Sequence, residues 1–109
     1  MPKKNLSAAA VPTLVQERLR IWGMAIRKQR LMQKLRVADL CRRMGISEAT
    51  LRRLEQGDAG AGAGLYLIAF HILGLFEDAA PEPPSALWQH DSGQRRVRLS
   101  TKEHADDYF

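Results

Sequence analysis

Apolar residues recur at helical spacing along most of the first three quarters of the chain. Pro12 and Thr13 mark a helix start, because proline suits a first turn and Thr13 and Gln16 have the spacing of a capping box. The apolar positions that follow predict one long amphipathic helix to about residue 34, bent near Gly23: Val15, Leu19, Trp22, Ile26 and Met32. We interpret Trp22 as an anchor of the core.

Two short helices are predicted next, joined at Gly45. The first buries one face through residues spaced i, i+3, i+4 and i+7, which are Val37, Leu40, Cys41 and Met44. Gly45 suits the positive φ of a helix C-terminus, and Ser47 suits the N-cap of the next helix. Leu51 and Leu54 form the buried side of that second helix, and Gln56-Gly57 ends it.

The remaining chain divides into a loop, a buried helix and an arm. Residues 58–64 form a loop rich in Gly and Ala, Leu65–Leu73 form a largely buried helix, and Gly74 stops it before a short turn at Leu75-Phe76. Three prolines then favour an extended chain. The predicted organisation is a flexible basic tail (1–11), a compact helical domain (12–77) and a Pro-rich hinge with a C-terminal arm (78–109).

Residues 96–100 alternate polar and apolar, which is typical of a half-buried β-strand. A lone strand in a helical chain has no partner of its own. It pairs with a second copy in the manner of an intermolecular strand, pairs with a partner protein, or does not form.

Charge is distributed unevenly over the 109 residues, whose formal net charge is +5. Residues 1–62 carry 13 basic and 5 acidic side chains, whereas residues 63–109 carry 4 basic and 7 acidic ones. The first part suits a polyanion and the second suits another partner. No apolar run of about 18 residues is present, so we expect no membrane span and a cytoplasmic, nucleoid-associated protein.

The two short helices have the pattern of a helix-turn-helix. Cys41 is small enough for the point where the helices cross, and Gly45 lies at the turn. With Leu51 and Leu54 facing inward, the second helix presents polar side chains to solvent. The predicted DNA-binding residues are Lys34, Arg36, Arg42, Arg43, Ser47, Glu48, Ala49, Thr50, Arg52 and Arg53.

Roles within this set follow from groove chemistry. Arg52 could bind a guanine with two hydrogen bonds and Glu48 could accept from a cytosine amine, while the other cations suit phosphates. The alternative for each arginine is a solvated helix face.

Residues 24–75 resemble the Cro/C1-type (XRE-like) helix-turn-helix family, through Arg27–Arg30, Ala38–Ser47, Thr50–Gly57 and Leu67–Gly74. The resemblance implies an all-α, compact five-helix fold that binds double-stranded DNA. It also implies an ion pair between Arg30 and Glu55. The Thr-Gln pair that usually opens the second helix is replaced by Arg36 and Val37, and Val37 cannot make the usual phosphate hydrogen bond.

The arm, with its Arg95–Leu99 and Asp106–Phe109 segments, makes the whole chain similar to HipB-type antitoxins. That resemblance implies a homodimer that represses its own operon and binds a HipA-type serine/threonine kinase toxin. Trp88 is an anchor for such a partner or folds back onto its own domain. The predicted partner-binding residues are Trp88, Arg96, Val97, Arg98, Leu99, Tyr108 and Phe109.

The sequence leaves three classes of function to consider. The first is a dimeric repressor that reads a palindromic operator, either as an antitoxin or as a phage or chromosomal regulator unrelated to a toxin. The second is a protein-interaction adaptor. The third, an enzyme, is disfavoured because the histidines lie in unrelated contexts and Gly60-x-Gly62-x-Gly64 follows no strand. The single cysteine excludes a multi-cysteine zinc site, and we expect no metal and no cofactor.

Overall fold

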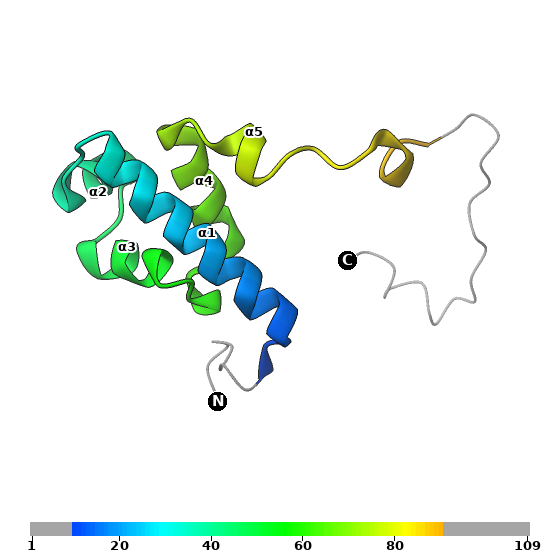
Figure 1. The fold of residues 1–109 in the computed structure, drawn as a ribbon, viewed down its shortest axis with the longest axis horizontal. Coiled ribbons are helices and arrows are strands. Elements are labelled where there is room, and N and C mark those ends of the chain that lie inside the picture. Colours follow the sequence, from blue (N-terminus) through cyan, green and yellow to red (C-terminus); the bar gives the residue numbers. More distant parts are fainter. Residues whose placement is uncertain (1–9, 91–109) are drawn as a thin grey trace.

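The computed structural model describes residues 10–90, and all the regular secondary structure in that range is helical. The elements are α1 (Thr13–Met32), α2 (Val37–Met44), α3 (Glu48–Glu55), η2 (Ala59–Ala61), α4 (Ala63–Leu73), α5 (Phe76–Ala79) and η3 (Ser85–Leu87) (Figure 1). The predicted all-α class is therefore confirmed for these residues. The predicted strand at 96–100 and most of the predicted basic tail lie outside them.

The core lies where α1 crosses α3 and α4 (Figure 1). Its fully buried large side chains are Ile26, Leu40, Leu51, Leu54, Tyr66 and Phe70. Trp22 packs edge-on to Phe70, with 5.0 Å between ring centroids, so it is a core anchor as predicted. The sequence analysis did not single out Tyr66, which is completely buried and whose hydroxyl donates a hydrogen bond of 2.8 Å to the carbonyl of Asp58.

The start of α1 corrects the predicted capping box. Thr13 is already helical, Pro12 is the N-cap, and no side chain caps the helix. The Gln16 amide instead donates to the carbonyl of Val11 at 3.1 Å. Val11 is buried, so the last residue of the predicted tail packs against the domain.

Two residues predicted on the buried face of α1 are exposed. Met32 is 65% exposed because it follows Ile26 by six residues, which turns it about 120° away from the core at about 100° per residue. Val15 is 44% exposed because the 20-residue α1 is much longer than the 8-residue α3 and 11-residue α4 that it crosses.

Gly23 permits a close contact between helices, and α1 continues through it as one element. A Cβ atom at this position would lie 2.5 Å from the carbonyl oxygen of Leu54 and 2.7 Å from that of Glu55. The backbones of α1 and α3 therefore touch at Gly23, and the bend predicted there is not needed to explain the glycine.

The predicted boundaries of the later helices are mostly confirmed. Gly45 and Gly74 end α2 and α4 in the left-handed region, with φ of 73° and 80°. Helix α4 begins at Ala63, two residues before the predicted start, and the predicted final turn is α5. None of the helices in the described range is long and apolar enough to cross a membrane.

Residues 81–90 extend away from the bundle, at the end opposite to α2 and α3 (Figure 1). Trp88 is 51% exposed, and its indole N–H donates to the carbonyl of Pro83 at 3.0 Å. The indole is therefore held by the turn in which it lies and not by the helical domain, so the alternative in which Trp88 folds back onto the domain is wrong.

Candidate nucleic-acid interface

Helix α3 is anchored to α1 by a nearly buried ion pair. The Arg30 guanidinium donates to both carboxylate oxygens of Glu55, at 2.7 and 3.2 Å, and to the carbonyl of Leu35 at 3.1 Å. The two side chains are only 8% and 10% exposed. This is the pair that the family resemblance implied, and its fork geometry fixes the orientation of α3.

The turn between α2 and α3 sets which side of α3 faces solvent. The Ser47 hydroxyl accepts a hydrogen bond from the backbone N–H of Thr50 at 3.1 Å, as an N-cap does. Leu51 and Leu54 are completely buried, so the opposite side of the helix is turned outward. The predicted DNA-binding residues of α3 lie there, exposed at Glu48, Ala49, Arg52 and Arg53 and half-buried at Thr50.

Asp39 holds two of the predicted phosphate contacts in place. Its carboxylate accepts from the Arg36 guanidinium at 3.1 Å and from that of Arg42 at 2.6 Å, and also from the backbone N–H of Arg36 at 3.2 Å. Hydrogen bonds from these arginines hold the pKa of Asp39 far below its usual value. The sequence reading missed this role, although Asp39 lies three residues from each arginine, a spacing that brings helical side chains together.

Two further predicted contacts are paired within the chain. Arg52 lies 3.6 Å from Glu48, and the Arg53 guanidinium donates to Asp58 at 2.9 Å. The hydrogen bond from Arg53 lowers the pKa of Asp58. Exposed ion pairs of this kind contribute about 0–1 kcal/mol, so a phosphate or a base could replace the carboxylate at small cost.

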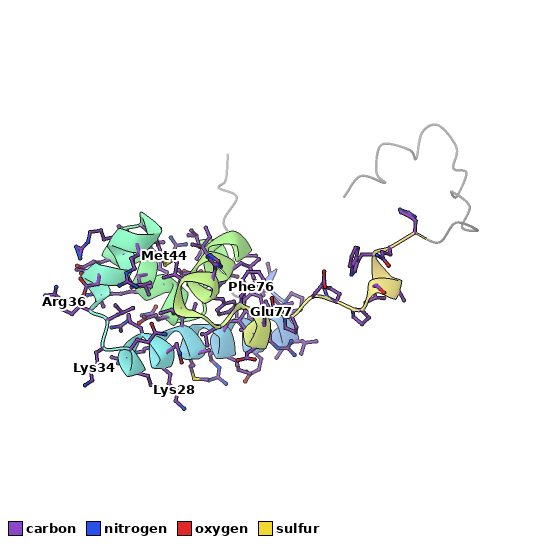
Figure 2. All side chains as sticks on the ribbon, turned by 90° about the horizontal axis from the view of Figure 1, so that it is seen from above. Lys28, Lys34, Arg36, Met44, Phe76 and Glu77 are labelled. Atoms are coloured by element: carbon purple, nitrogen blue, oxygen red, sulfur yellow. The ribbon has the colours of Figure 1, made fainter. Side chains whose placement is uncertain are left out.

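Lys34 and Arg43 have no ion pair with any residue that the structure describes, and both are exposed. Lys34 occupies the turn between α1 and α2 with a φ of 60°. Lys34 and Arg36 lie at the same end of the domain (Figure 2). Lys34 and Arg43 therefore carry positive charge that no described carboxylate compensates.

Arg27 and Gln56 belong to the same surface and were not predicted. Together with Arg52 they line a hollow of about 290 Å³ between α1 and α3. The position of Arg27 could have been predicted from its spacing. It precedes Arg30 by three residues, so the two lie on the same side of α1, and Arg30 binds Glu55 at the end of α3. The surface formed by α2, α3 and these residues is called the candidate interface below.

Among the described residues we find neither an activated thiol nor a cluster of metal-ligating side chains. Burial raises the pKa of the Cys41 thiol, the opposite of what a thiolate nucleophile requires. Within residues 10–90 there is no group of three or more His, Cys, Asp or Glu side chains that could hold a metal ion.

The predicted partner-binding residues divide between two parts of the chain. Trp88 is exposed, and the segment to which it belongs, residues 81–90, extends from the end of the bundle opposite to α3 (Figure 1). Arg96, Val97, Arg98, Leu99, Tyr108 and Phe109 lie outside the residues that the structure describes.

Comparisons with known proteins identify no relative: no family model matches the chain, and neither a curated protein nor a solved structure is significantly similar to it.

Proposed function

We propose that the protein is a sequence-specific DNA-binding repressor that uses α2 and α3 as a helix-turn-helix. The observation that carries the proposal is the fixed presentation of α3. The Arg30–Glu55 pair and two fully buried leucines hold one side of this helix, and its other side is polar and solvent-facing. A helix that enters the major groove needs both properties.

The charges around α3 support the same proposal. Lys34, in the turn before α2, and Arg43, in α2, have no competing carboxylate among the described residues, so they are suited to phosphates. Arg52 can exchange Glu48 for a guanine edge, because the existing pair is long and exposed. A single domain of this size makes few contacts, so we propose that two copies bind a palindromic operator.

The proposal is tested by selecting binding sites from a random duplex library and titrating the selected duplex at several salt concentrations. We expect Arg43→Ala to weaken selected and unrelated duplexes alike, whereas Arg52→Ala lowers the preference for the selected sequence. Arg18→Ala is the matched control, since Arg18 is an exposed arginine of α1 outside the candidate interface. Binding that is independent of salt, or equal losses in all three variants, would refute the proposal.

A second role, as the antitoxin partner of a HipA-type kinase, is favoured by one observation. Leu87 is 75% exposed and Trp88 is 51% exposed on a segment that extends from the domain. Exposed tryptophans are common anchors of protein interfaces. Co-purification with the product of a neighbouring gene, retained in the full chain and lost in Trp88→Ala, tests it, and loss of DNA binding in the same variant would contradict it.

A further inference from the structure

The solvent side of α1 carries an apolar pattern that the candidate interface does not use. Its apolar members Leu14, Ile21, Met24 and Leu31 are between 45% and 70% exposed. Such side chains are unremarkable when they are scattered singly, but these share one face of one helix. Arg27, Met32 and part of this face line a shallow depression there.

The spacing on this face is that of a coiled-coil seam. Positions alternate by three and four residues, as the a and d positions of successive heptads do. The six positions, called the α1 seam below, are Leu14, Glu17, Ile21, Met24, Lys28 and Leu31. Lys28 points away from the rest of the domain (Figure 2).

The α1 seam is complementary to itself in the antiparallel direction. A second α1 can be placed antiparallel to the first, with the two-fold axis level with the midpoint between Trp22 and Gly23. Leu14 of one copy then lies opposite Leu31 of the other, and Ile21 lies opposite Met24. The same arrangement places Glu17 opposite Lys28, so the only two charged positions meet with opposite sign. In an antiparallel helix pair, each a position of one helix faces a d position of the other. In a two-fold interface, if residue i of one copy contacts residue j of the other, residue j of the first copy also contacts residue i of the second.

We propose that α1 binds α1 of a second copy of this chain, antiparallel, along the α1 seam. The contact runs for about 25 Å at 1.5 Å per residue. Both helices are already formed within their domains, so association orders side chains and not backbone. The Glu17 carboxylate binds Arg20 of its own helix through one oxygen, Oε2, and its other oxygen has no hydrogen bond or ion pair with a described residue.

Two features weaken the contact. Arg20 and Arg27 flank the same edge of the seam and face each other across the two-fold axis, where like charges repel. The seam is also shorter than the three to four heptads of a stable coiled coil. The dimer is therefore concentration-dependent and not obligate. It deepens the proposed function by relating two copies through a two-fold axis, and its test uses no DNA.

The test is sedimentation velocity of the full chain over a range of concentrations up to about 1 mM. Glu17→Lys and Lys28→Glu each place like charges in two layers, so each should raise the dissociation constant at least about tenfold. The double variant exchanges the two charges and should restore association. Rescue by the double variant cannot come from the Glu17–Arg20 pair, which both Glu17 variants lack.

Glu77→Lys in α5 is the matched control, since it reverses one exposed charge outside both the seam and the candidate interface and should leave association unchanged. Circular dichroism verifies that each variant keeps its helices. A wild-type chain that is monomeric throughout, or a double variant as defective as the single ones, would overturn the proposal.

Orientation is tested by cysteine cross-linking. A mixture of Leu14→Cys and Leu31→Cys chains should form a disulfide dimer, whereas Leu14→Cys alone should not, because its two cysteines lie at opposite ends of the seam. The wild-type chain controls for Cys41, which is buried. Cross-linking of Leu14→Cys with itself would indicate parallel helices and overturn the antiparallel arrangement.

Discussion

Replacement of Gly23 by alanine should destabilise the protein, although alanine is the better helix former. In an isolated helix the substitution favours folding by about 1 kcal/mol. Here the new Cβ would lie 2.5 Å from the carbonyl oxygen of Leu54, 2.7 Å from that of Glu55 and 2.9 Å from the carbonyl carbon of Glu55. All three are backbone atoms, so no side chain can rotate away.

The expected magnitude follows from these opposing effects. Relief of the contact requires α1 and α3 to separate by roughly 1 Å, while the Arg30–Glu55 pair holds them together. Overpacking of this kind costs about 1–3 kcal/mol, and we place Gly23→Ala at the upper end because rigid backbone meets the new atom. After the helix-propensity gain, the net loss in the free energy of unfolding is about 1–2 kcal/mol.

Urea denaturation and thermal unfolding, both followed by circular dichroism, measure this change. A loss of 1 kcal/mol corresponds to a fall in Tm of about 4–8 °C for a domain of this size. Gly64→Ala in α4 is the matched control, because a Cβ there meets no atom within 4 Å. It should raise the free energy of unfolding by about 0.5–1 kcal/mol. A Gly23→Ala protein as stable as the wild type would refute the close contact between α1 and α3.

Other predictions concern single side chains. Arg30→Ala should lower the free energy of unfolding by about 3–5 kcal/mol in urea, because it leaves the Glu55 carboxylate nearly buried and unpaired; a loss below about 1 kcal/mol would contradict this. The pKa of Asp39 is lower in the folded protein than in the unfolded chain. The ionised Asp39 carboxylate therefore stabilises the fold above about pH 4, and this stabilisation is lost as the pH falls below that value. Asp39→Asn should therefore flatten the acid side of a plot of Tm against pH. Burial raises the pKa of Tyr66 to about 12, so its contribution, complete below about pH 10, should be lost between about pH 10 and pH 12. An alkaline fall in Tm that persists in Tyr66→Phe would exclude Tyr66 as its source. Trp88→Ala should change the free energy of unfolding by less than about 0.5 kcal/mol, because Trp88 bonds only within its own turn; a larger loss in urea would show that Trp88 packs on the domain.

The helix boundaries around the turn at Gly45 could be predicted because local signals agree there. The apolar spacing of α2, the glycine at its end and the Ser47 cap each depend on neighbouring residues alone. The start of α1 at Pro12 and Thr13 was predicted correctly from the same kind of local signal, but the capping box was not. Pro12 occupies the N-cap and Thr13 is already helical, so the side chain of Thr13 caps nothing.

Features that depend on distant residues could not be predicted from the residues alone. The core position of Tyr66 depends on the Asp58 carbonyl, which lies in a loop whose path the sequence does not define. The exposure of Val15 follows from the relative lengths of α1 and its neighbours, which is a property of the assembled bundle. The Arg30–Glu55 pair spans 25 residues and was expected only through the family resemblance.

The ion pairs of α1, α2 and α3 also affect how the protein responds to different anions. Each acid between residues 10 and 62 holds an arginine of the same chain: Glu17, Asp39, Glu48, Glu55 and Asp58. A single small anion must displace a carboxylate to bind any of these paired arginines, and it gains little by the exchange. A ligand with regularly spaced negative charges can displace several exposed carboxylates in one binding event. These acids therefore act as internal competitors that favour a repeating polyanion over isolated ions.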